Sequence, residues 1–376
     1  MPLAKLGRVV PTEVQLLHRG PYRRKMRKPD FKPPFKWTGG KNRMWGQYAP
    51  HFFPEREFTR FVDLFTGACS VGMWIAENYP KAEIVINDSN EELIELYTMI
   101  KCCYQPLETE YIKVVDKFLS FPEHLDKKKF YYELRDRHAF QYNEIDDVTL
   151  AAELLFMLKT NFNGMWKAYK KMDLKYSTPP GTLTQKPKFF ETDSLRKFAD
   201  FLSRTTIMCG DFEDTSKYIS KDTFVYADPP YRDSIVDYKG GFDDKEQLRL
   251  ITFLKAMSDC GALISESNKE IGDGFWKNNF DENYNIYEYN TKYTAGRGTT
   301  VTKAREVLIT NYAPLEESEE TMNKIDELIE KICEEEKLTT VEVLTKYPDL
   351  SKLKHEAELR EKKEKAEKDK RQLLKG

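Results

Sequence analysis

Residues 223–231 of the chain read Thr-Phe-Val-Tyr-Ala-Asp-Pro-Pro-Tyr, and this stretch decides the fold. Its first five residues form an apolar run that predicts a buried strand of a parallel sheet. Pro229 and Pro230 end the strand because proline cannot donate a ladder hydrogen bond. Asp228 and Tyr231 are therefore expected at the carboxyl end of a strand, where open α/β sheets bind their ligands.

Further apolar runs predict the other strands of this sheet, at residues 61–65, 84–87, 262–265 and 307–312. Helices are expected between them, at residues 70–79 and 91–101. The last predicted strand follows a glycine-rich turn, Gly296-Arg297-Gly298. Alternation of strands and helices is typical of an α/β fold, so we expect an open, doubly wound, mostly parallel sheet with helices on both faces.

The composition is that of a globular protein. Among 376 residues, 32% are charged and 13% aromatic, and no apolar run approaches the roughly 18 residues of a spanning helix. Residues 1–10 lack the apolar core of a secretory signal. The six cysteines include no Cys-x-x-Cys pair, so we expect reduced thiols, no metal site and a cytoplasmic protein without a membrane contact.

Charge divides the chain into segments, although the formal net charge is only −2. Residues 1–30 carry eight Lys or Arg against two acids, which predicts a basic arm, either a solvated leader or a contact for phosphates. A largely helical insert at residues 107–201 divides the sheet domain into residues 31–106 and 202–314. Residues 315–376 are rich in Glu and Lys and predict exposed helices, one of them starting at a Thr339-x-x-Glu342 capping box. These helices could dock a protein partner or a second copy of the chain.

The second half of the insert has the composition of a nucleic-acid contact. Residues 159–188 hold seven lysines against one acid, interleaved with aromatic residues and a Pro179-Pro180-Gly181 turn. The alternative interpretation is that the lysines solvate a surface and the aromatics pack beneath it. We favour nucleic-acid contact, with these candidate residues: Asn161, Asn163, Lys167, Lys170, Lys171, Pro179 and Lys186.

The turn after residues 61–65 predicts a nucleotide-like ligand. Phe65 is followed by Thr66-Gly67-Ala68-Cys69-Ser70, small residues that let the backbone approach a ligand where a helix begins. Asp88 lies 21 residues after Gly67, the spacing of an acid that binds ribose hydroxyls, although it could instead be the N-cap of the next helix. The turn lacks the third glycine of a pyrophosphate loop, which favours an adenosyl cofactor without a phosphate.

The residues after the strand at 223–227 suit an aryl amine. Such an amine is a poor nucleophile because its lone pair is delocalised into the ring. The Asp228 carboxylate and the Pro229 carbonyl could accept both N–H bonds, so that the nitrogen becomes tetrahedral and its lone pair faces a methyl donor. The Tyr231 ring would stack on a base turned out of its helix.

Taken in order, these motifs resemble those of the Dam-type (alpha-group, D12 class) DNA adenine-N6 methyltransferases. Residues 35–41, Phe-Lys-Trp-Thr-Gly-Gly-Lys, resemble the N-terminal cofactor segment of that family, and residues 65–70 its glycine loop. Gly210-Asp211-Phe212 resembles the segment that holds the adenine of the cofactor. Further matches lie at residues 162–164, 179–181, 264–268 and 305–308, so the resemblance spans about residues 31–314.

The resemblance implies a Rossmann-like methyltransferase sheet with an inserted, mainly helical target-recognition domain and a helical C-terminal extension. It implies methyl transfer from S-adenosylmethionine to N6 of a flipped adenine in double-stranded DNA, in a bacterial or phage-infected bacterial cell. The catalytic residues that it assigns are Asp228, Pro229, Pro230 and Tyr231. The cofactor residues are Trp37, Gly39, Lys41, Phe65, Gly67, Asp88, Asp211 and Phe212.

Two positions depart from the family pattern. Cys69 stands where the family has the second glycine of its loop. Lys167 stands where members that read GATC have an arginine, and lysine lacks the planar fork that binds guanine, so we do not expect GATC as the site. The alternatives that the residues leave open are cytosine-N4 methylation, an RNA substrate, and a DNA-binding regulator or decoy without turnover.

Overall fold

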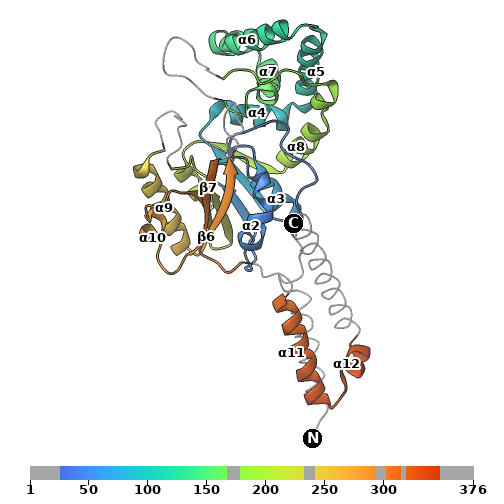
Figure 1. Ribbon diagram of the computed structural model, residues 1–376, viewed down its shortest axis with the longest axis vertical. Coiled ribbons are helices and arrows are strands. Elements are labelled where there is room, and N and C mark those ends of the chain that lie inside the picture. The colour runs from blue at the N-terminus through green and yellow to red at the C-terminus, as the bar shows by residue number, and fades with distance from the viewer. Residues whose placement is uncertain (1–25, 167–177, 233–241, 294–301, 315–318, 348–376) are drawn as a thin grey trace. The chain divides into compact units, whose positions relative to one another are not determined.

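The computed structural model describes residues 26–166, 178–232, 242–293, 302–314 and 319–347 (Figure 1). At its centre is a seven-stranded sheet, made of β1 (Arg60–Asp63), β2 (Glu83–Asp88), β3 (Thr205–Cys209), β4 (Thr223–Ala227), β5 (Leu263–Glu270), β6 (Asn285–Tyr293) and β7 (Thr302–Thr310). The strand order is β3-β2-β1-β4-β5-β7-β6. Strands β1 to β5 are parallel, whereas β7 runs antiparallel to β5 and β6. The predicted doubly wound, mostly parallel sheet is confirmed.

The described residues also form α-helices and short 3-10 helices. The α-helices are α2 (Trp45–Phe52), α3 (Ser70–Asn78), α4 (Glu91–Cys102), α5 (Tyr104–Ser120), α6 (His124–Phe140), α7 (Asp147–Thr160), α8 (Asp193–Ser203), α9 (Asp244–Asp259), α10 (Phe275–Asn279), α11 (Glu319–Glu336) and α12 (Thr340–Lys346). Short 3-10 helices are η3 (Lys41–Arg43), η4 (Tyr142–Glu144), η5 (Pro187–Phe190) and η6 (Phe212–Tyr218). Among the residues described, no helix is long and apolar enough to cross a membrane.

Apolar side chains cover both faces of the sheet. On one face, residues of β1 and β4 such as Val62 and Val225 pack with Leu250 and Leu254 of α9. On the other face lie α3, α4 and α8. A Cβ on Gly72 of α3 would meet the Phe201 ring of α8 at 3.2 Å, so this glycine lets α3 lie close to α8 on that face.

The strand order opens a crevice at the carboxyl ends of the strands. From β1 the chain goes to β2 and β3 on one side, and then returns to β4 on the other side of β1. The loops after β1 and β4 therefore lead away from each other and leave a crevice between them. In open α/β sheets, such a crevice is where ligands bind. Asp63 ends β1 and Asp228 follows β4, and both therefore lie at this crevice.

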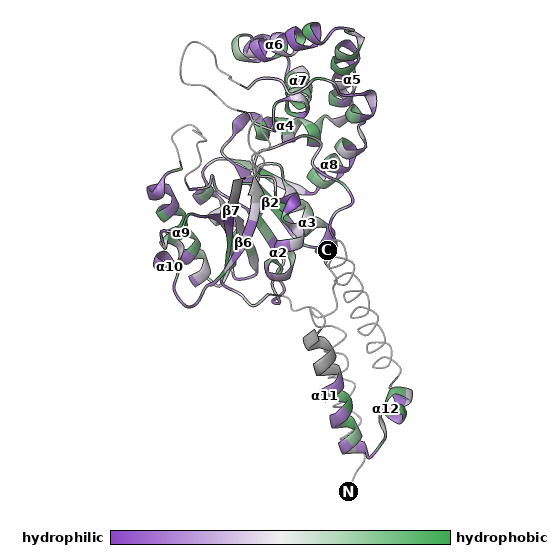
Figure 2. Ribbon diagram, in the orientation of Figure 1, coloured by the Kyte–Doolittle hydropathy of each residue, from purple (hydrophilic) through white to green (hydrophobic). Residues whose placement is uncertain are grey.

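Helices α5, α6 and α7 form a bundle within the insert. Helix α7 is its centre, because every residue from Leu150 to Thr160 is buried, and α5 and α6 pack against it. In Figure 2, α7 carries hydrophobic residues whereas α6 is largely hydrophilic. Helix α8, which falls within the predicted bounds of the insert, packs on α4 and β3 of the sheet layer.

The strands that sequence analysis placed correctly are those in the middle of the sheet. Strand β4 covers residues 223–227 as expected, whereas β1 ends at Asp63 rather than at residue 65, and β7 ends at Thr310 rather than at residue 312. Strands β3 and β6 were not predicted, because they form the two edges of the sheet and their half-exposed residues make no continuous apolar run. Residues 296–298 lie outside the described residues.

The described residues divide into two compact units. One comprises residues 27–48 and 58–312, with the sheet and the insert, and the other includes α11 and α12. In the second unit, Leu328, Ile329 and Ile332 of α11 pack with Val343 of α12, so these helices are not only a charged surface but bury a small core of their own. The predicted capping box is confirmed, since Glu342 Oε2 accepts from the Thr339 amide at 2.8 Å.

A tight turn after α7 fastens the insert to the segment before η3. Asn163 and Gly164 both take positive φ, at 54° and 72°. The Asn161 side chain holds the turn closed, because its Oδ1 accepts from the Gly164 amide at 3.1 Å. The Gly164 carbonyl in turn accepts from the Thr38 amide at 3.2 Å. A Cβ on Gly164 would lie 2.9 Å from the backbone nitrogen of Trp37.

We therefore predict that Gly164→Ala lowers the free energy of unfolding by about 1–3 kcal/mol, because alanine is strained at positive φ and its Cβ would displace the Trp37 backbone. Gly46→Ala is the matched control. Gly46 lies in α2 with open space around it, so alanine there should leave stability unchanged or raise it slightly. Urea denaturation of both variants measures the difference, and equal midpoints for the two would contradict the prediction.

Candidate active site

The crevice between β1 and β4 is a cavity of about 670 Å³. Its walls come from the segment before η3, from the loops after β1, β2, β3 and β4, and from the start of α9. All twelve residues that the motifs predicted for catalysis and the cofactor line it: Trp37, Gly39, Lys41, Phe65, Gly67, Asp88, Asp211, Phe212, Asp228, Pro229, Pro230 and Tyr231. Segments nearly two hundred residues apart in sequence thus meet in one place, while the role of each residue stays a prediction.

The loop after β1 brings its backbone to the cavity through two residues with positive φ. Gly67 has φ of 43°, and a Cβ there would lie 3.1 Å from the Trp37 ring. Cys69 has φ of 59° and is the N-cap residue of α3. Its side chain is fully buried, and burial raises the pKa of the thiol. A cysteine therefore fits at this left-handed position, where the family pattern has a glycine.

Asp88, at the end of β2, holds this loop in place by accepting hydrogen bonds from backbone amides. Its carboxylate accepts from the Gly67 amide at 2.9 Å and from the Asn90 amide at 3.0 Å. The N-cap of α4 is Asn90, whose side chain accepts from the Leu93 amide, so the N-cap interpretation of Asp88 is wrong. Burial raises the pKa of Asp88, and the amide hydrogen bonds oppose that shift.

Asp63 is a second buried acid in the cavity wall, and the sequence analysis did not single it out. It is 1% exposed, and among the described residues its Oδ1 atom has no hydrogen-bond partner. Burial raises its pKa, and the neighbouring Asp228 raises it further. An acid that closes an apolar strand is a signal that could have marked it.

Asp211 and Phe212, which follow β3, meet an arginine of α9. The Arg249 guanidinium donates to both Asp211 oxygens, at 2.9 and 2.7 Å, and lies 4.2 Å from the centroid of the Phe212 ring. The hydrogen bonds from Arg249 lower the pKa of Asp211. Arg249 also lines the cavity, and its place on a helix far along the chain gave no sequence signal.

Asp228 is paired with Lys41 across the cavity. Lys41 Nζ donates to the two Asp228 oxygens at 2.6 and 2.5 Å, and to the Gly39 carbonyl at 3.1 Å. The Ser267 hydroxyl of β5 donates to Asp228 Oδ1 at 3.0 Å. Burial raises the pKa of Asp228, whereas Lys41 lowers it. Lys41 was expected beside the cofactor, and in this structure its ammonium lies on the predicted catalytic acid.

The Tyr231 ring is fixed by a carboxylate of β7. Its hydroxyl donates to Glu306 Oε2 at 3.1 Å, and the hydroxyl of Tyr48 donates to the same oxygen at 2.9 Å. Lys41 Nζ lies 5.0 Å from the centroid of the Tyr231 ring. Glu306 was quoted only as part of a family motif, although an acid next to an apolar strand run is a signal for a buried carboxylate.

The far end of the same loop is held by α9. Gln247 donates to the Pro230 carbonyl at 2.9 Å. Arg232, 6% exposed, makes ion pairs with Asp244 at 2.7 Å and Asp273 at 2.8 Å. The loop therefore has fixed ends on both sides of the two prolines.

The candidate DNA-contacting residues differ in their exposure to solvent. Asn163 and Lys186 are exposed, and so is Pro179, whose carbonyl accepts from the Phe162 amide. Asn161 is fully buried and holds the turn after α7. Lys167, Lys170 and Lys171, with Tyr169 and Tyr176, lie outside the described residues. Trp166 is buried and donates to Glu92 at 2.8 Å, so this aromatic residue packs rather than faces solvent.

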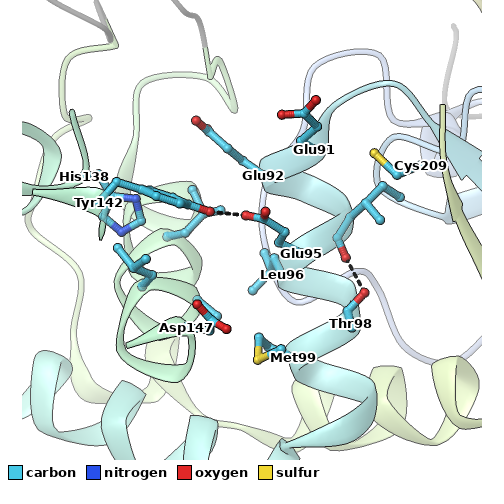
Figure 3. Close-up of a pocket in the computed structure, with 14 residues that line it drawn as sticks. Glu91, Glu92, Glu95, Leu96, Thr98, Met99, His138, Tyr142, Asp147 and Cys209 are labelled. Atoms are coloured by element: carbon cyan, nitrogen blue, oxygen red, sulfur yellow. Dashed lines mark hydrogen bonds between the residues drawn. The ribbon is translucent and has the colours of Figure 1, made fainter. Parts of the chain in front are cut away.

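A second, smaller cavity of about 270 Å³ lies between α4 and the start of α7 (Figure 3). Carboxylates of α4, among them Glu91, Glu92 and Glu95, lie along one side, and the Tyr142 hydroxyl donates to Glu95. It contains no predicted site residue. Within the described ranges, no group of three or more His, Cys, Asp or Glu residues could hold a metal ion.

Known proteins match the chain across this region. The family model of D12 class N6 adenine-specific DNA methyltransferases matches residues 37–295. The chain is 32% identical to the Type II methyltransferase M.MjaIII of Methanocaldococcus jannaschii, over 68% of this chain and 90% of that protein. It is 28% identical to the Type II methyltransferase M1.LlaDCHI of Lactococcus lactis, over 75% and 96%. It is 27% identical to the DNA adenine methylase of Vibrio cholerae, over 78% and 93%.

Every residue that lines the 670 Å³ cavity falls inside the range matched by the family model. The predicted family resemblance is confirmed, and the chain belongs to the D12 class of N6 adenine-specific DNA methyltransferases.

Proposed function

We propose that this adenine-specific DNA methyltransferase uses S-adenosylmethionine and acts on an adenine turned out of double-stranded DNA into the 670 Å³ cavity. The observation that carries the proposal is the Asp228 carboxylate, which already binds a nitrogen donor, Lys41 Nζ, inside the cavity. An acid that is satisfied by N–H donors at this place is suited to an aryl amine. The adenine-specific family favours N6 of adenine over N4 of cytosine as that amine.

The cavity walls fit S-adenosylmethionine. Asp63 offers a buried carboxylate oxygen without a partner among the described residues, which suits the ammonium of a methionine moiety. Asp88 faces the cavity at the end of β2, where a carboxylate accepts from ribose hydroxyls. Phe212 and Arg249 border the cavity after β3, where the family resemblance places the adenine of the cofactor. When bound there, S-adenosylmethionine supplies an activated methyl group.

The residues of the chain orient the target amine and take up its charge. The Asp228 carboxylate and the Pro229 carbonyl accept the two N–H bonds, which turns the nitrogen lone pair toward the methyl donor. As the nitrogen gains its fourth bond it becomes positive, and the neighbouring carboxylate stabilises that charge and accepts the excess proton. Tyr231 stacks on the base. Lys41 leaves Asp228 when the amine arrives, and the Gly39 carbonyl remains as an acceptor for it.

The insert is proposed to read the DNA. Asn163 and Lys186 are exposed on it, and the turn that contains Asn163 is hydrogen-bonded to the segment that lines the cavity. Lys167, which stands where members that read GATC have an arginine, argues against GATC as the recognition site. The helices α11 and α12 are proposed to dock a partner protein or a second copy of the chain.

Asp228→Ala should lower methyl transfer by about 10³-fold or more, because the amine loses the acceptor that orients it and stabilises its charge. Transfer of tritium from labelled S-adenosylmethionine to unmethylated plasmid DNA measures the rate, and a gel-shift assay should show DNA binding largely intact. Asp193→Ala, an acid exposed on α8, is the control and should keep wild-type activity. If Asp228→Ala retained wild-type turnover, the proposed mechanism would be contradicted.

Asp88→Ala should weaken the binding of S-adenosylmethionine by about 10-fold or more, since a hydrogen bond to a charged group contributes about 1.5–3 kcal/mol. Isothermal titration of the cofactor into the variant measures its Kd. Glu83→Ala, at the other end of β2 and exposed, is the control. Wild-type affinity in Asp88→Ala would remove Asp88 from the cofactor site.

Lys41→Met should move the acidic limb of the kcat/KM profile to higher pH. Lys41 lowers the pKa of Asp228, so its removal raises that pKa, and the carboxylate is then protonated at a higher pH as the pH falls. Activity requires the ionised carboxylate and disappears below that pKa. Lys245→Met, a cavity-edge lysine on α9, is the control and should leave the limb in place. A limb that stays fixed or moves to lower pH in Lys41→Met would contradict the pairing.

A further inference from the structure

We propose that Glu306 is a positioning residue for methyl transfer, which fixes the Tyr231 ring in the plane against which the target base stacks. The inference deepens the function proposed above and depends on it. Glu306 does not line the cavity itself, so it acts through the tyrosine rather than by touching the base.

Glu306 is a buried carboxylate that directly precedes the apolar run Val307–Ile309 of its strand. It is 3% exposed in β7, between Arg305 and Val307. Val307 and Ile309, which follow it on the strand, pack in an apolar cluster with Trp276 of α10. Burial of a carboxylate costs several kcal/mol unless hydrogen bonds compensate for the lost water. An acid at this position therefore needs polar partners.

Those partners are two phenol hydroxyls that converge on one oxygen. Tyr48 of α2 and Tyr231 of the catalytic loop both donate to Glu306 Oε2, at 2.9 and 3.1 Å. Hydrogen bonds to an ionised acceptor are about twice as strong as neutral ones, so the carboxylate is a firm anchor for the tip of each ring. Tyr48 is completely buried, which gives the anchor a rigid second support.

The hydrogen bond to Glu306 fixes the orientation of the Tyr231 ring because other contacts hold the backbone of its loop. Gln247 holds the Pro230 carbonyl, and Arg232 is clamped by Asp244 and Asp273. The ring is thus held at its hydroxyl from β7 and at its backbone from α9. Lys41 Nζ lies 5.0 Å from the ring centroid and on Asp228, so the tyrosine and the acid border the same place. A base amine on Asp228 would bring its own ring beside Tyr231.

The test is a double-mutant cycle of Glu306→Gln and Tyr231→Phe in the full-length chain. Tyr231→Phe removes the donor, whereas Glu306→Gln replaces the charged acceptor with a neutral amide oxygen and so weakens the bond, and each variant keeps the shape of its side chain. With unmethylated plasmid DNA and labelled S-adenosylmethionine, each single variant should lower kcat by about tenfold with the KM for the cofactor unchanged. The double variant should fall no more than about twofold below the slower single variant, because both changes act on the same contact.

The matched control is a phenol–carboxylate pair away from the cavity. Tyr104 donates to Glu108 at 2.8 Å within α5, so Tyr104→Phe removes the same kind of hydrogen bond and should leave kcat at the wild-type value. The inference is overturned if the two cavity-side effects multiply to about 100-fold, if kcat is unchanged in either single variant, or if Tyr104→Phe lowers kcat equally. Should Glu306→Gln fail to fold, Tyr231→Phe alone decides, because it keeps the carboxylate and its bond to Tyr48.

A pH profile separates positioning from a pure charge effect. Glu306 raises the pKa of Asp228, so Glu306→Gln should move the acidic limb of kcat/KM to lower pH, whereas Tyr231→Phe should not. The loss of kcat in Glu306→Gln should persist on the plateau above that limb. Recovery of full activity on the plateau would overturn the positioning role. An inactive Asp228→Ala beside an unimpaired Glu306→Gln would defeat this inference alone, and active Asp228→Ala would defeat the proposed function.

Discussion

The Asp228 carboxylate imposes the constraint that organises the cavity. Its side chain is only 18% exposed at the end of β4, and a largely desolvated charge must be paired. Lys41 reaches it from 187 residues earlier in the chain, and Ser267 reaches it from the neighbouring strand. One charge therefore binds together the segment before η3, the catalytic loop and β5. Loss of either partner would leave Asp228 with a larger uncompensated desolvation cost, which is why the three segments depend on each other.

The same pairing selects what can replace Lys41. A group that enters must bring N–H donors to the carboxylate, because an acceptor in its place would leave the acid unpaired. Adenine presents an exocyclic amine, whereas thymine would turn a carbonyl oxygen toward Asp228. Cytosine also carries an amine, so the carboxylate alone does not separate it from adenine. The shape of the cavity must make that distinction, and the chain belongs to an adenine-specific family.

Sequence reasoning succeeded where a signal was local. Strand β4 is buried on both faces and shows as one apolar run, and the twelve predicted site residues, which all line one cavity, come from short motifs, nine of them at strand ends and three in the segment that leads into η3. It failed where the signal depends on tertiary contact. Strands β3 and β6 are sheet edges without an apolar run. Arg249 and Glu306 acquire their meaning only from Asp211 and Tyr231, which lie 38 and 75 residues away. The pairing of Lys41 with Asp228, 187 residues away, likewise had no local signal.

These distant contacts decide what the tetrapeptide can do. Two prolines stiffen the backbone of the loop, but a stiff loop is useful only if its ends are held in place. Arg232 and Gln247 tie one end to α9, while Glu306 ties the Tyr231 ring to β7 on the opposite side of β5. The antiparallel strand β7 thus does more than extend the sheet. It places a carboxylate beside the loop after β4, so a displacement of β7 relative to β5 would tilt the Tyr231 ring, on which we propose that the base stacks, even with Asp228 unchanged.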